Sequence, residues 1–197
     1  MAKRKTAASR RGKSSSALRK LQPAESQEVL EALLKAHPKL RKQAEEIALA
    51  LISEESCGEI ADQVEWDLEH LGLDDLNSRA GNHGLGYVGP GEAAWELLHE
   101  AIDPIIADRD RHLELGQRRQ ALEICKGLVL GLYEVRNKEN DGCLGWAPDF
   151  TEQTAEEILE KWRGRGKAKT RSFPRSFVDE HVPEWMGLVD RALSGPC

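Results

Sequence analysis

The chain has 197 residues and a mass of 22.0 kDa; hydrophobic residues make up 40% of it, charged residues 31% and aromatic residues 5%. This length and composition fit one ordinary globular domain with a short extension, and they exclude a collagen, a disulfide-rich scaffold and a wholly disordered chain. The net charge of −6 is unevenly distributed, because residues 1–21 carry eight basic side chains and no acidic one. The remainder of the chain therefore has a net charge of −14.

Residues 1–22 are rich in Lys, Arg, Ser and Ala and lack helical apolar spacing, so we expect a disordered basic tail. Because the tail contains no aromatic residue, any contact with nucleic acid should be electrostatic and non-specific. The alternative is a tail that folds back on the acidic remainder of the chain. The basic side chains expected to contact a polyanion are Lys3, Arg4, Lys5, Arg10, Arg11, Lys13, Arg19 and Lys20.

The first helix is expected to begin near Pro23 or Ser26. Pro38 should end it and open a second helix, and because so few residues separate the two, we expect an antiparallel hairpin. Ser56 and Glu59 have the spacing of a capping box for a third helix. That helix should bury one apolar face and end at Gly72, which suits the position after a helix C-terminus. The residues of the buried face are Ile60, Ala61, Val64, Leu68 and Leu71.

A glycine-rich loop, residues 79–91, precedes a helix from about Pro90 that Pro104 should kink or restart. The helix of about residues 117–137 is the most apolar, so we expect it at the centre of the fold. Gly127 and Gly131 lie four residues apart on this helix. They leave a stripe of nearly bare backbone against which a neighbouring helix can pack closely.

After a loop at residues 141–149, Thr151 or Thr154 should cap a helix that ends at Trp162. A last helical segment, interrupted by Pro183, completes the chain. We find no alternating strand pattern, so the sequence predicts an all-α protein, either an irregular multi-helix bundle or a short solenoid-like array of helical hairpins. The expected divisions are a tail (1–22), a helical domain (23–163), a basic linker (164–175) and a C-terminal helical segment (176–197).

Residues 84–89 match the pattern GxGxxG. A dinucleotide-binding loop must leave a parallel strand, and no strand pattern precedes this match, so we interpret it as a turn-rich connector. His83 is the histidine best placed for a function, because Arg79 and Tyr87 lie near it in the sequence.

Asp67 with His70, and Glu96 with His99, have a spacing that could chelate a metal from one helix face. Both pairs fall outside the expected buried faces, and a di-iron site needs ligands that project into the bundle. Cys125 lies on an apolar stripe and is interpreted as a buried thiol. The sequence therefore predicts no catalytic residue, no cofactor and no metal site.

The four cysteines are isolated, and the basic start is not followed by the apolar stretch of a signal peptide. Reduced thiols in a cytoplasmic protein are the simplest interpretation. No apolar run of about 18 residues is present, so we expect no membrane span.

Short matches in chain order, spread over residues 28–165, resemble the helical region that accompanies SWIM zinc fingers in bacterial proteins. The CxC and CxH units of the finger itself do not occur, so the resemblance implies neither a zinc site nor the finger's nucleic-acid binding. It implies a helical domain without catalytic residues, in which Arg79, Tyr87, Trp95 and Tyr133 shape the fold or a partner surface. The matching segments are Ala36-His37-Pro38, Arg79-Ala80-Gly81, Gly86-Tyr87-Val88, Glu92-Ala93-Ala94-Trp95-Glu96-Leu97-Leu98, Leu113-Glu114-Leu115-Gly116, Gly131-Leu132-Tyr133 and Trp146-Ala147-Pro148-Asp149-Phe150.

Together these features predict a non-catalytic helical module that binds an unknown protein partner, rather than an enzyme. The residues expected on its partner surface are Arg79, His83, Tyr87 and Trp95. The alternative is a nucleic-acid-associated accessory protein, tethered through its basic N-terminal tail.

Overall fold

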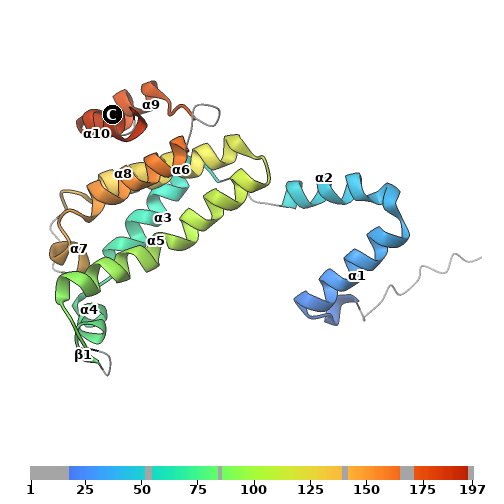
Figure 1. Ribbon diagram of the computed structural model, residues 1–197, viewed down its shortest axis with the longest axis horizontal. Helices are drawn as coiled ribbons and strands as arrows, with labels where there is room; N and C mark the ends of the chain where they lie inside the picture. The colour runs from blue at the N-terminus through green and yellow to red at the C-terminus, as the bar shows by residue number, and fades with distance from the viewer. Residues whose placement is uncertain (1–17, 52–54, 84–85, 139–141, 165–170, 195–197) are drawn as a thin grey trace, which may run out of the picture. The chain divides into compact units, whose positions relative to one another are not determined.

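The computed structural model describes residues 18–51, 55–83, 86–138, 142–164 and 171–194. The chain divides into two compact units, residues 1–53 and residues 54–197. Apart from one two-stranded sheet, the regular elements of the described residues are helices, which confirms the predicted all-α class (Figure 1). The larger unit is an irregular multi-helix bundle.

The smaller unit contains two helices joined by a tight turn. After the short 3₁₀ helix η1 (Leu18–Lys20), α1 (Pro23–Ala36) begins with a proline in its first turn, and Pro38 opens a second 3₁₀ helix, η2 (Pro38–Leu40), that continues into α2 (Arg41–Leu51). Both expected boundaries are therefore confirmed. The helices leave the turn as the two arms of a V (Figure 1). No residue of α1 or η2 is buried.

The larger unit is built around α6 (Arg118–Val135), which packs against α3 (Cys57–Glu69), α5 (Pro90–Glu114) and α8 (Phe150–Arg163). The central position predicted for the most apolar helix is confirmed. Ser56 and Glu59 form the expected cap at the start of α3, where the Glu59 backbone N–H donates to the Ser56 hydroxyl at 3.3 Å.

Helices α3 and α6 run parallel and are in contact along their whole length. At one end, the Gln120 side-chain amide donates to the backbone carbonyl of Glu55 at 2.8 Å, and at the other end Lys138 pairs with Glu65 and Glu69. Between these ends lie Gly127 and Gly131. The predicted close packing along this glycine stripe is confirmed.

The approach at the two glycines is too close for any side chain. A Cβ atom built on Gly127 would lie 2.5 Å from the Cβ of Ile60 and 2.8 Å from the backbone oxygen of Cys57. One built on Gly131 would lie 2.6 Å from the Cβ of Val64 and 2.8 Å from the backbone oxygen of Ala61. Two of these neighbours are backbone atoms of α3, so an added Cβ could be accommodated only if α3 itself moved.

Other boundaries differ from expectation. Helix α3 ends at Glu69, and Gly72 instead precedes the short helix α4 (Leu73–Arg79), where its N–H donates to Asp75 at 2.9 Å. Helix α5 continues through Pro104 without a restart, since Ile102 and Ile105 on either side are buried and hold the segment in place.

The structure also contains elements that the sequence did not predict. Strands β1 (Gly81–His83) and β2 (Gly86–Val88) form an antiparallel hairpin, and α7 (Cys143–Trp146) is a single helical turn in the expected loop. Three-residue strands are too short to show an alternating pattern, so the sequence carried no strand signal.

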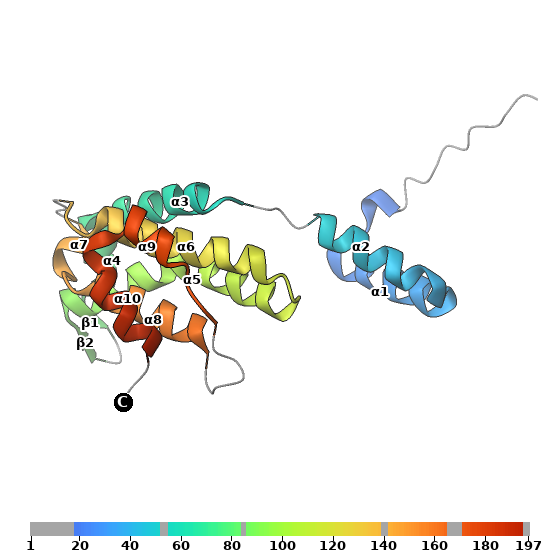
Figure 2. The ribbon, with the colours of Figure 1, turned by 90° about the horizontal axis from the view of Figure 1, so that it is seen from above.

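The C-terminal segment belongs to the core of the larger unit. Helix α9 (Arg175–His181), 3₁₀ helix η4 (Pro183–Trp185) and α10 (Met186–Ser194) share buried apolar contacts with the bundle, and α10 packs on α8 (Figure 2). The expected Thr151 or Thr154 cap is wrong: Asp149 occupies the N-cap position, and both threonines are buried within α8.

Replacing Gly127 by Ala should destabilise the protein by about 1–3 kcal/mol, because the new methyl group overpacks the contact with α3. Gly187→Ala is the matched control, since a Cβ on this α10 glycine would meet nothing within 4 Å, and the change should be neutral or slightly stabilising. Urea unfolding of both variants measures the difference, and equal free energies of unfolding would contradict the close packing of α3 and α6.

Candidate protein-interaction surface

One end of the larger unit carries a group of exposed apolar and aromatic side chains. Helix α4, the β hairpin, the start of α5 and α7 come together there (Figure 1). We use the name hairpin-end surface for four exposed side chains on these elements and on the last turn of α3: Trp66, Leu73, Tyr87 and Trp146. Their exposed fractions are 62%, 47%, 67% and 51%, values more typical of polar side chains.

The hairpin presents Tyr87 to solvent because of its short, glycine-supported geometry. Gly81 and Gly86 both have positive φ angles, 117° and 140°, which L side chains rarely adopt. Tyr87 pairs across the two strands with Asn82, and Val88 is half-buried against the core. The hairpin is therefore anchored at Val88 and exposes the aromatic ring next to it.

Arg79 fixes the hairpin's preceding helix to α5. Its guanidinium donates to both carboxylate oxygens of Glu100, at 3.0 and 2.8 Å, and to Glu96 at 3.1 Å. These hydrogen bonds lower the pKa of Glu100 and raise that of Arg79. Arg79 was expected on a partner surface, and the structure places it in this ion-pair cluster between α4 and α5.

Helix α7 closes the end of the bundle. The Cys143 backbone N–H donates to the carbonyl of Leu71 at 3.0 Å, which ties α7 to the end of α3. A Cβ on Gly91 would lie 3.4 Å from the carbonyl oxygen of Trp146, so α7 also lies directly against the first turn of α5. The Trp146 ring is thus held on a short element that is fixed on both sides.

The two other predicted partner-surface residues have different placements. Trp95 is half-buried, and its ring meets Phe150 edge-on with centroids 5.1 Å apart, so it supports the core. The His83 backbone pairs with Gly86 in the hairpin, and its side chain lies outside the described residues. Among the members of the predicted set whose side chains the structure describes, Tyr87 is the most exposed.

Sequence reasoning missed Trp66, Leu73 and Trp146 as surface residues. Trp66 did carry a signal, since it lies off the stripe of α3 that contains Ile60 and Val64. In the structure it is exposed and stacks on His70, with ring centroids 3.5 Å apart.

Residues from the two acid–histidine pairs, Asp67 with His70 and Glu96 with His99, make contacts within the fold. The His70 ring donates a hydrogen bond through Nδ1 to the Trp66 carbonyl at 2.8 Å, Glu96 pairs with Arg79, and the His99 ring packs edge-on against Phe150. Among the described residues, no three His, Cys, Asp or Glu side chains lie close enough together to hold a metal ion.

Cys125 is completely buried, as predicted. Desolvation by burial raises the pKa of its thiol to about 12, although the charge of Arg109 acts in the opposite direction. A thiol with this pKa is protonated at neutral pH and is therefore a poor nucleophile.

An open depression of about 480 Å³ lies between α5 and the end of α8. The described residues that line it carry charges of both signs and supply no hydroxyl, thiol or imidazole group. These residues are Asp110, Glu157, Glu160, Lys161, Arg163 and Gly164.

The predicted polyanion-contact residues Lys3, Arg4, Lys5, Arg10, Arg11 and Lys13 lie outside the described residues. Arg19 and Lys20 belong to η1, and Lys20 is exposed. Within the described ranges, no helix combines the length and the apolar character needed to cross a bilayer.

No protein-family model matches the chain, and neither a curated protein nor a solved structure is significantly similar to it. The resemblance to the helical region of SWIM proteins therefore stays a prediction.

Replacing Arg79 by Gln should raise the pKa of Glu100 toward its ordinary value, because the guanidinium hydrogen bonds that lower it are lost. Since the folded-state pKa is the lower one, the pair stabilises the fold above the unfolded-state pKa, and this effect is lost as pH falls through the folded-state pKa. Carboxyl ¹³C NMR during a pH titration measures the pKa of Glu100 in both proteins, and urea unfolding at several pH values measures the change in stability.

Glu59 is the internal control for this titration. Its pKa is lowered by the Ser56 cap, which does not involve Arg79, so it should keep its shift in the variant. A Glu100 titration that is identical in the two proteins would contradict the ion-pair cluster.

Proposed function

We propose that this protein is a non-catalytic helical module that binds another protein through the hairpin-end surface. The observation that carries the proposal is the exposure of Tyr87 and Trp146 on two short elements that are both fixed to the start of α5. Tyr and Trp are the residues most enriched at the energetic centres of protein interfaces, since each contributes a large apolar area and few rotatable bonds.

The elements around the surface support the proposal because contacts within the protein itself hold them in place. Arg79 joins α4 to α5, and the Cys143 N–H joins α7 to the end of α3. A surface that is already ordered avoids much of the entropy cost of binding. The described side chains of these elements supply no nucleophile–base pair, so binding is the activity that their chemistry favours.

The charge of the neighbouring elements indicates the kind of partner. Helix α4 begins with Asp74 and Asp75, α5 has Glu92 in its first turn, and Asp149 precedes α8. The nearby cations Arg79 and Lys138 are already paired with carboxylates. A partner with an apolar centre and a basic rim fits this surface best.

Tyr87→Ala and Trp146→Ala should each weaken partner binding by about thirtyfold, the effect of removing an interface side chain worth about 2 kcal/mol. Affinity purification with quantitative mass spectrometry identifies the partner, and titration of the purified pair measures the change. Thermal unfolding should be nearly unchanged, because both side chains are exposed.

Leu115→Ala is the matched control for these variants. Leu115 is 45% exposed but lies in the turn between α5 and α6, away from the hairpin. Recovery of the same proteins by wild-type and by both aromatic variants would refute binding through this surface.

The charge of residues 1–21 favours a second function, association with nucleic acid. These residues hold eight basic side chains and no acid, whereas the remainder of the chain has a net charge of −14 and should be repelled by phosphates. In this alternative, the tail tethers an acidic helical module to DNA or RNA without reading its sequence.

If the tail binds duplex DNA through eight phosphate contacts, the log–log dependence of affinity on salt should have a slope of up to about −7. Between about 50 and 200 mM salt, this slope corresponds to roughly four decades of affinity. Fluorescence anisotropy with a mixed-sequence duplex measures it for the full chain and for a chain that lacks residues 1–21. Binding that survives removal of the tail would contradict the charge argument.

A further inference from the structure

A cavity of about 200 Å³ adjoins the hairpin-end surface. It lies between the end of α6 and the segment that joins α7 to α8. Gly145 and Ala147, the residues on either side of the exposed Trp146, both belong to its lining. A partner that contacts the Trp146 ring therefore has this cavity within reach.

The lining determines the size and the character of an occupant. Val135, Leu144, Ala147 and Pro148 supply an apolar wall. One water molecule occupies about 30 Å³ of the liquid, so the cavity has room for about seven groups of that size. A leucine side chain and one carboxylate together have that many non-hydrogen atoms. The cavity therefore fits the end of one apolar residue rather than a drug-sized molecule.

The charges of the lining favour an anion. Among the described residues that line the cavity, the charged ones are Arg136 and Lys138, and none is acidic. The chain beyond residue 21, by contrast, has a net charge of −14. Lys138 is already paired with Glu65 and Glu69. Arg136 is therefore the cation that can offer most to a ligand.

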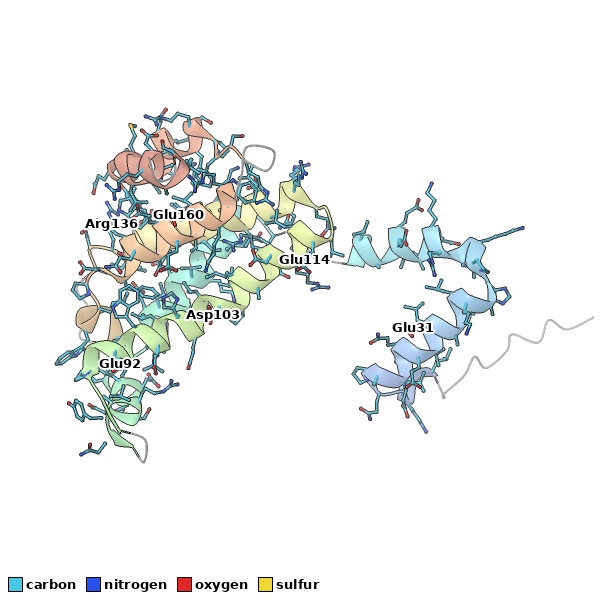
Figure 3. All side chains as sticks on the ribbon, viewed as in Figure 1. Glu31, Glu92, Asp103, Glu114, Arg136 and Glu160 are labelled. Carbon is cyan, nitrogen blue, oxygen red and sulfur yellow. The ribbon has the colours of Figure 1, made fainter. Side chains whose placement is uncertain are left out.

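Arg136, which is labelled in Figure 3, is held in one position but has an unused donor. Its guanidinium carbon lies 3.3 Å from the centre of the Tyr133 ring, and that ring meets Trp185 edge-on. Nη1 donates to the Tyr133 carbonyl, and Nη2 donates to Glu184 at 2.9 Å. The Nε–H is buried and has no acceptor among the described residues. A buried donor without a partner raises the free energy of the protein, so an acceptor supplied by a ligand is stabilising here.

We propose that the cavity receives the C-terminal residue of the partner protein, with an apolar side chain of leucine size against the apolar wall and its carboxylate against Arg136. The proposal rests on the proposed function, because it names the part of the partner that binds beside Trp146. A C-terminal residue carries an apolar side chain and a carboxylate together, whereas Asp and Glu lack the apolar group. Capture of a C-terminal carboxylate is a recurring mode of peptide recognition. Nearby acidic groups such as Asp149 favour basic residues before it.

Two-dimensional ¹H–¹⁵N NMR of the full chain tests the proposal with two small probes, N-acetyl-leucine and N-acetyl-leucine amide. The acid should shift the backbone signals of Leu144, Gly145 and Ala147, with a dissociation constant on the order of 1 mM. The amide should bind about tenfold more weakly, because it lacks the charged acceptor for Arg136. Cavity signals that do not move at about 20 mM acid, or equal affinities for the two probes, overturn the proposal.

A charge variant identifies the residue that recognises the carboxylate. In Arg136→Gln, the affinities for acid and amide should lie within about twofold of each other. Arg119→Gln is the matched control, since it makes the same change at an exposed position in the first turn of α6 and should keep the tenfold preference. A preference that survives in Arg136→Gln would contradict the assignment. The comparison of acid and amide on the wild type does not depend on how well either variant folds.

A third probe separates a peptide end from a free small carboxylate. N-acetyl-Lys-Lys-Leu with a free C-terminus should bind at least about tenfold more tightly than N-acetyl-leucine at low salt, because its lysines meet the acidic rim. Equal affinities would identify a free small carboxylate as the ligand and refute capture of a peptide end. None of these titrations uses the partner protein, so their failure is distinct from a failure of partner binding through Tyr87 and Trp146.

Discussion

The parallel contact between α3 and α6 at Gly127 and Gly131 is the constraint on which the larger unit depends. Two neighbouring helices that run in the same direction cannot be joined by a tight turn, so the chain must travel back between them. The return is α5, and α4 with the β hairpin reverses the chain at the end of α3. The hairpin and its exposed Tyr87 therefore stand where they do because bare backbone lets α3 lie directly on α6.

The parts of the fold that could be predicted are those whose cause is local. The Ser56–Glu59 cap, the helix start at Pro23 and the break at Pro38 depend on residues within three positions of one another. The glycine stripe is also local, since spacing by four places Gly127 and Gly131 on one face. What a pattern of this kind leaves open is the partner: the sequence indicated close packing on α6, and only the fold identifies α3 as the helix that packs there.

The parts that could not be predicted depend on contacts between distant segments. Arg109 is 1% exposed although the carboxylate to which it donates, Asp110, is its neighbour in the chain, and no local pattern indicates such burial for a charged side chain. The same limit applies to the site. Tyr87 could be named from the sequence as a residue of a partner surface. The exposure of Trp66, Leu73 and Trp146 depends on which segments pack beside them, and a local pattern does not show that.

Both units expose apolar side chains to water. Cations that connect the packed helices, such as Arg79 and Lys138, are paired with carboxylates, and the Cys125 thiol is buried and protonated. Exposed apolar side chains such as Tyr87 and Trp146 leave apolar area in water, and its removal lowers the free energy by about 25 cal/mol for each Å². Association is the process that releases this energy.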